Sequence, residues 1–339
     1  MADSAVLLHA DPGVRGRMGG ERAAVTGRVG AVRIRGMPAV LALLAGLSAC
    51  NPDQPAPRGT GAVVDDRGRA HDPSVPLTRI VSLIPAVTET LVAIGGADLL
   101  VARTRYDEDP ALADLPSVGG GIDPSLEFLA QLNPDLVVLW ASGANGVLLE
   151  DRLDEIGLNW YAASIQTVDD FRRHARNLGR LVGKSAAADS VIARVEGDFA
   201  AATQSWSGRD PAEVVYVVQM EPPMTVGPGT FLDALLGTAG AFNAFGDIVG
   251  SWPLVSMEEV VKRDPDYVIM PVQGYGTPEA RSDYSDPSIE RLRAQPGWSA
   301  VPAVVAGRVI SVDGSLFGRP GPRMGEAALY LATRLHGSR

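Results

Sequence analysis

Three aromatic side chains of this 339-residue chain fall beside predicted strand ends or loops. Trp140 and Tyr106 each follow an apolar run that reads as a strand, and Trp252 lies in a loop of the second half. In parallel α/β sheets, ligands bind at the carboxyl ends of the strands. Aromatic rings give a large contact area at a small cost in entropy. Any one of these residues alone could be a rim residue of the core, but the three together predict the lining of a large, partly apolar ligand site.

Two arginines, Arg319 and Arg323, lie in a proline-stiffened loop after a predicted strand at 309–312. A guanidinium group suits a carboxylate or phosphate of the ligand through forked hydrogen bonds. The alternative is that these arginines cap backbone carbonyls of the loop. Met224 ends a similar loop, after the predicted strand 214–219, and offers adaptable apolar contact.

Residue constellations for catalysis or metal binding are missing from the sequence. The four histidines (His9, His71, His174 and His336) do not pair at metal-ligand spacing, and there is no HExxH, CxxC or GxSxG motif. The glycine clusters lack the lysine and the spacing of a phosphate-binding loop. We therefore expect a binding protein with no metal site and no resident cofactor, rather than an enzyme.

The elements that must position these residues alternate between strand and helix. The segment 79–84 reads as a buried strand, 87–94 has helical spacing, and further strands are predicted at 99–104 and 136–140. This order predicts a layered α/β fold. A second series begins with the strand 214–219.

An internal repeat relates the two halves at a constant offset of about 131 residues. In each copy a serine (Ser125, Ser256) precedes a short helix with glutamate in its first turn, and an Asn/Asp-Pro-Asp turn starts a buried strand. Between the halves, 186–206 reads as one helix of about 20 residues, or roughly 30 Å, which could act as a strut.

The predicted organisation has five parts, and it includes two segments outside the folded lobes. The part before the fold has the polar, proline-rich composition of a disordered linker. The parts are a leader with a signal peptide at 1–49, a disordered linker at 50–77, an N-terminal α/β lobe at 78–183, a connecting helix at 184–208 and a C-terminal α/β lobe at 209–339.

Cys50 is the only cysteine of the chain. It follows an apolar run at 38–49 that is too short to span a bilayer as a helix, with Arg33 and Arg35 just upstream. The residues Leu-Ser-Ala-Cys resemble a bacterial lipobox, which implies export, cleavage before Cys50 and lipidation of its thiol. We expect an extracytoplasmic protein anchored to a membrane, the alternative being a fortuitous hydrophobic leader.

The formal net charge is −10 at pH 7, so nucleic acid is not an expected partner because phosphate binding needs a basic surface. No cysteine beyond Cys50 is available for disulfides or thiolate sites. The fold must be stabilised by its core.

From about residue 78 to its end, the chain resembles the helical-backbone substrate-binding proteins of ABC importers for cobalamin, haem and ferric siderophores. The resemblance implies two Rossmann-like lobes bridged by one long helix, with the ligand in a cleft between them. It is carried by Arg79–Glu89, Asp123–Glu127, Asn133–Asp135, the segment 227–237 and the loop 319–323.

In that family one glutamate on each lobe docks against arginines of the permease, and Glu127 and Glu258 match those positions. This docking would explain the repeat, because a permease with two-fold symmetry needs an equivalent contact residue on each lobe. The alternative is that both glutamates only favour the helix dipole. The resemblance implies an ABC permease as partner, and we expect the protein to be a monomer.

The cobalamin-binding members are the most similar in appearance. Aromatics of their corrinoid pocket correspond to Tyr106, Trp140 and Trp252, and we expect Pro85 at the same site. A further tryptophan of that pocket corresponds to Gly121 here, which weakens the assignment.

Arginines near the predicted site favour the alternative ligands, since siderophore-binding members use arginine against anionic groups. A ferric siderophore or haem is therefore the alternative ligand, and an enzyme on the same scaffold is a remote one. The arginines are Arg103, Arg105, Arg319 and Arg323.

Overall fold

The computed structural model describes residues 61–141, 143–272 and 287–337. Each half of the chain builds a four-stranded parallel sheet, with strand orders β4-β3-β5-β6 and β10-β7-β11-β12. The predicted α/β class and two-lobe arrangement are confirmed. The strands are β3 (Ile80–Ser82), β4 (Leu100–Ala102), β5 (Leu136–Trp140) and β6 (Trp160–Ala163) in the N-lobe, and β7 (Ala212–Tyr216), β10 (Ala241–Asn243), β11 (Tyr267–Val272) and β12 (Val309–Asp313) in the C-lobe.

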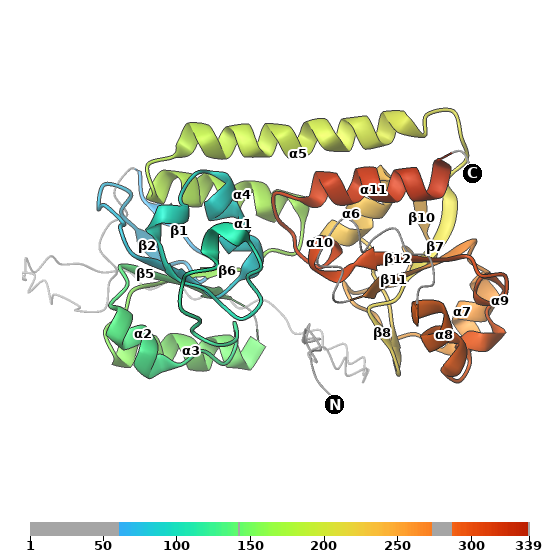
Figure 1. Cartoon of the computed structure of the whole chain (residues 1–339), viewed down its shortest axis with the longest axis horizontal. Coiled ribbons are helices and arrows are strands. Elements are labelled where there is room, and N and C mark those ends of the chain that lie inside the picture. The colour runs from blue at the N-terminus through green and yellow to red at the C-terminus, as the bar shows by residue number, and fades with distance from the viewer. Residues whose placement is uncertain (1–60, 142, 273–286, 338–339) are drawn as a thin grey trace, which may run out of the picture.

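Helices cover both faces of each sheet (Figure 1), as parallel sheets require. The N-lobe helices are α1 (Pro85–Ala93), α2 (Leu126–Leu132), α3 (Gly143–Glu155) and α4 (Val168–Leu181). The C-lobe helices are α6 (Phe231–Thr238), α7 (Met257–Arg263), α8 (Pro287–Ala294), α9 (Pro302–Val305), α10 (Gly314–Phe317) and α11 (Met324–His336). Single 3₁₀ turns lie at Ala97–Leu99, Pro110–Leu112 and Trp298–Ala300.

One long helix, α5 (Ser185–Ser205), bridges the lobes and packs on α4 at one end and on α11 at the other (Figure 1). At each of these two helix contacts, one helix carries a glycine that lets the backbones approach closely. A Cβ at Gly179 of α4 would lie 2.6 Å from the Cβ of Ala188, and a Cβ at Gly325 of α11 would lie 2.4 Å from the Cβ of Asp198. The helix backbones can approach this closely only because both positions lack a side chain.

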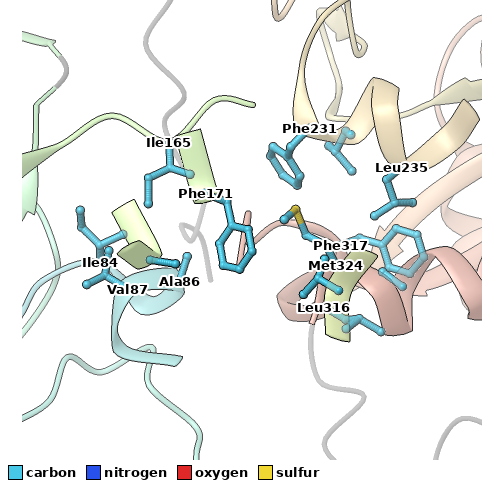
Figure 2. Close-up of a cluster of buried hydrophobic side chains, with 14 of the residues drawn as sticks. Ile84, Ala86, Val87, Ile165, Phe171, Phe231, Leu235, Leu316, Phe317 and Met324 are labelled. Carbon is cyan, nitrogen blue, oxygen red and sulfur yellow. The ribbon is translucent and has the colours of Figure 1, made fainter. Parts of the chain in front are cut away.

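Apolar packing also joins the lobes directly. Among the described residues, separate clusters lie beneath the outer helices of each lobe, while a third cluster includes residues of both lobes. Figure 2 shows part of that shared cluster, with Ile84 and Phe171 contributed by the N-lobe and Phe231 and Met324 by the C-lobe. Because interiors are close-packed, this shared core favours a fixed arrangement of the two lobes.

The internal repeat appears as two copies of one capped helix. The hydroxyl groups of Ser125 and Ser256 each accept a hydrogen bond from the backbone N–H three residues on, at 3.3 and 3.1 Å. The helices α2 and α7 each end at a residue in the left-handed conformation, Asn133 and Asp264, both with φ of 44°. The same caps therefore form at both sequence-predicted positions.

The aspartate of each Asn/Asp-Pro-Asp turn locks the following strand to its neighbour. The Asp135 carboxylate accepts hydrogen bonds from the backbone N–H groups of Thr78 and Arg79, at 2.7 and 2.9 Å. The Asp266 carboxylate accepts one from Glu213 N–H at 2.9 Å. The hydrogen bond from Thr78 N–H is the largest cause that lowers the pKa of Asp135.

Residues 61–77 are ordered, so the prediction of a disordered linker over 50–77 is wrong for this part. They contain an antiparallel hairpin, β1 (Val63–Val64) and β2 (Ala70–His71), that packs on α4. Val63 is buried. The composition was misleading because the polar residues here find partners in the N-lobe. Residues 50–60 lie outside the described residues.

A second short hairpin, β8 (Gln219–Met220) and β9 (Pro223–Met224), extends from the C-lobe sheet. The structure describes no helix that has both the length and the apolar character to cross a membrane within these residues.

Candidate functional site

The predicted N-lobe ligand residues come together at the carboxyl edge of the first sheet. Pro85 is the first residue after the β3 loop and opens α1, Trp140 ends β5, and Tyr106 lies in the loop that follows β4. These are three adjacent strands of the sheet. Tyr106 is 42% exposed, whereas Trp140 is partly buried against the shared cluster. This placement fits a ligand site at the strand ends.

The predicted C-lobe residues also lie close to one another. Met224 forms an isolated antiparallel bridge with Leu254, two residues after Trp252. Trp252 packs against the same shared cluster as Trp140. Leu254 is 59% exposed, and Ile122 in the N-lobe is 53% exposed; neither was among the predicted site residues. In the sequence, Leu254 stands two residues after Trp252, and Ile122 directly follows Gly121.

Arg319 links the two lobes. Its Nη1 lies 2.6 Å from Oε1 of Glu89 on α1, and its Nη2 donates to the Tyr106 carbonyl at 2.6 Å. The Arg319 and Glu89 side chains are only 15% and 13% exposed. The guanidinium is thus bonded within the protein, because a buried cation needs a counter-ion. Its predicted contact with ligand remains a prediction.

Glu89 is the site residue to which sequence reasoning gave no role, although it stands in the motif after Pro85. Burial raises the pKa of Glu89, and the nearby Arg319 charge offsets this only in part. Its sequence signal was a glutamate directly after the apolar start of α1.

The other arginines near the site are engaged in different ways. Arg105 pairs with Asp123 at 2.8 Å, and Arg323 pairs with Glu326 at 3.0 Å. Arg103 donates to the carbonyl of the next residue at 3.2 Å, but its buried Nε has no hydrogen-bond partner in the part of the chain that the structure describes. The arginines that favoured an anionic ligand therefore largely have carboxylates beside them.

Gly121 stands where the resemblance implies a pocket tryptophan. A Cβ at this position would lie 2.4 Å from the Leu83 carbonyl oxygen and 3.9 Å from Nε1 of Trp140. The backbone of the loop is too close to β3 for any side chain at 121. A tryptophan there would need the loop to move outwards.

A buried polar chain ties the first hairpin to the N-lobe. The Tyr161 hydroxyl lies 2.7 Å from Nδ1 of His174, whose Nε2 lies 2.9 Å from the Asp66 carboxylate. Asn177 donates to the same hydroxyl at 3.1 Å, and burial raises the pKa of Tyr161. These contacts hold the segment that carries Asp66 against β6 and α4.

Glu127 and Glu258 are exposed in the first turns of α2 and α7. Figure 1 places both helices on the sides of their lobes that face away from α5. Cys50, the predicted lipidation site, lies outside the described residues. No group of three or more His, Cys, Asp or Glu that could hold a metal ion occurs in the described ranges.

The sequence pattern of the periplasmic binding protein family matches residues 80–316. A cobalamin-binding protein of Halobacterium salinarum is 27% identical over 272 residues, which cover 76% of this chain and 69% of that protein. A vitamin B12-binding protein of Vibrio parahaemolyticus is 25% identical over 250 residues, covering 73% and 86%. The structure of a periplasmic haem-binding protein of Roseiflexus sp. RS-1 superposes with a TM-score of 0.62 at 26% identity, covering 76% and 97%.

Proposed function

Because the chain belongs to the periplasmic binding protein family, we propose that it is the substrate-binding protein of an ABC importer that carries cobalamin or a related corrinoid between its lobes. In this proposal the protein is a carrier, not an enzyme. It hands its ligand to a permease and holds no cofactor of its own. Two similar relatives, named as cobalamin- and B12-binding proteins, support the choice of ligand.

The choice of a corrinoid as ligand rests on one combination: aromatic residues gather at the site, and the arginines near it largely have carboxylates beside them. Pro85, Tyr106 and Trp140 gather at one sheet edge, and Met224 neighbours Trp252 on the other lobe. A corrin ring offers apolar faces to such residues and a periphery of neutral amides. A siderophore or haem would instead use free arginines for its anionic groups.

A haem or a ferric siderophore is the second candidate ligand, favoured by the structural similarity to a haem-binding protein. The buried Nε of Arg103, without a partner among the described residues, is the single donor that supports it. Export and lipidation at Cys50 complete the proposal, and their support is the sequence before Cys50.

Tryptophan fluorescence tests the ligand. The domain from residue 61 onwards is titrated with cobalamin, cobinamide, haem and ferric siderophores. We expect the two corrinoids to quench its tryptophan fluorescence at micromolar concentration or below. Replacing Trp140 or Trp252 by alanine should weaken corrinoid binding by roughly tenfold or more, since buried tryptophans are frequent hot spots. As a control, Trp206→Phe should leave the affinity unchanged, because Trp206 stacks on His336 at the far end of α5. Absence of quenching by either corrinoid would refute the cobalamin proposal.

A further inference from the structure

We propose that Glu89 sets the charge selectivity of the inter-lobe site by holding Arg319, so that neutral corrinoids are bound in preference to ligands with carboxylate groups. This inference rests on the proposed function. It gives Glu89 of α1 a role in ligand selectivity.

The geometry explains why Arg319 is unavailable to a ligand. In the Arg319 guanidinium, Nη1 donates to the Glu89 carboxylate and Nη2 donates to the Tyr106 carbonyl, both at 2.6 Å. Both charged side chains are mostly buried. A ligand carboxylate that took the place of Glu89 on Arg319 would leave the buried Glu89 carboxylate without its counter-ion.

Two further carboxylates, Asp107 and Glu108, follow Tyr106 in the chain, and Asp107 acts on this ion pair. Asp107 is 7% exposed, its Oδ1 has no hydrogen-bond partner in the described ranges, and its charge contributes to the raised pKa of Glu89. Glu108 accepts a hydrogen bond from the Ser315 hydroxyl of the other lobe at 3.2 Å. A ligand carboxylate near Arg319 would therefore meet the charge of Asp107 as well as that of Glu89, while Arg323 is the further positive charge that acts on Glu89.

The ion pair also lies beside the predicted ligand surface. The Tyr106 carbonyl accepts a hydrogen bond from Arg319, and the Tyr106 side chain is exposed. The guanidinium of neighbouring Arg105 lies 5.7 Å from the centre of the Tyr106 ring and pairs with Asp123. A ligand in contact with Tyr106 thus meets arginines whose charges are already balanced. Amide groups can bond to such a surface without displacing a carboxylate.

The test compares cobalamin with a cobalamin monocarboxylate, in which one peripheral propionamide is hydrolysed, so that the ligands differ by one charge. Wild-type protein should prefer the amide by about tenfold or more, corresponding to about 1.4 kcal/mol. Glu89→Gln should reduce this preference to about threefold or less and should strengthen the binding of haem, which carries two propionates.

Two further variants keep the result interpretable. Glu196→Gln removes the same charge from α5, where Glu196 pairs with Arg172 on the surface, and should leave the preference unchanged. The double variant Glu89→Gln, Arg319→Gln removes both partners. It should lose the gain in haem binding even if the single variant is less stable.

The outcomes separate this inference from the proposed function. Tight corrinoid binding with the same amide preference in wild type, Glu89→Gln and Glu196→Gln would overturn the role of Glu89 and leave the carrier proposal standing. Binding of haem but of no corrinoid would overturn the corrinoid proposal, and a haem affinity raised by Glu89→Gln would then still support the role of Glu89.

Discussion

Asp66 shows how much a single side chain contributes to the N-lobe. Its Oδ2 accepts hydrogen bonds from the Ser164 backbone N–H at 2.6 Å and from His174, and its Oδ1 lies 2.5 Å from Arg173. Burial by itself raises the pKa of Asp66, but these hydrogen bonds outweigh it and hold the pKa well below its ordinary value. The charged form is therefore stabilised by folding.

This shift predicts an acid-dependent loss of stability. Because the folded pKa of Asp66 lies below the unfolded value of about 4, its contribution is complete above that pH and is lost as the pH falls towards the folded pKa. Denaturant unfolding between neutral pH and strong acid should show the free energies of unfolding of wild type and Asp66→Asn converging as the pH falls. Asp169→Asn removes an exposed carboxylate from α4 as the control and should follow wild type. A constant difference between wild type and Asp66→Asn would contradict the prediction.

At the scale of elements, the bridge between the lobes depends on where glycine is required. Gly325 of α11 lies against Asp198 of α5, while Gly197, next in the chain to Asp198, has open space around the position that a Cβ would take, with no atom within 4 Å. One glycine permits close helix packing, and the other leaves a weak point in an exposed part of α5. The same substitution should therefore have opposite effects at the two positions.

Alanine at Gly325 should lower the free energy of unfolding by roughly 1–3 kcal/mol, since the new methyl group overpacks the contact between α11 and α5. Alanine at Gly197 should raise it by about 0.5–1 kcal/mol, through helix propensity alone. Urea titrations of the two variants beside wild type measure both changes, and each variant serves as the control for the other. Shifts of the same sign would show that packing at Gly325 is looser than the geometry indicates.

At the scale of the whole molecule, the repeat places Glu127 and Glu258 in equivalent helices on two lobes whose arrangement is set by α5 and by a shared core. A partner with two-fold symmetry could contact both at once. Neither glutamate belongs to the proposed ligand surface. Docking and ligand binding should therefore be separable.

Alanine at both Glu127 and Glu258 should leave corrinoid affinity unchanged and abolish uptake of labelled cobalamin by cells that supply the permease. Each single variant should reduce uptake less than the double variant does. Glu196→Ala, on the opposite, α5 side of the molecule, is the control and should transport normally. Uptake at the wild-type level by the double variant would exclude the docking role.

The sequence by itself was sufficient for features that depend on neighbours along the chain. Strand β5 occupies the predicted residues 136–140, and the predicted bridging helix lies within one residue of α5 at each end. The serine caps of the repeat also form as expected. Apolar periodicity, caps and breakers act over a few residues, so they can be read without knowing the fold.

Tertiary structure alone decided which charges are free. Glu89 and Arg319 stand 230 positions apart, and Asp66 and His174 stand 108 apart, so no local pattern links either pair. The arginine predicted to meet the ligand is held by Glu89, and the polar segment predicted to be disordered is held by the N-lobe. Gly121 likewise shows its tight contact with the Leu83 carbonyl only in three dimensions. These outcomes depend on how the chain topology brings distant groups together, because a buried charge must find its partner wherever the fold places one.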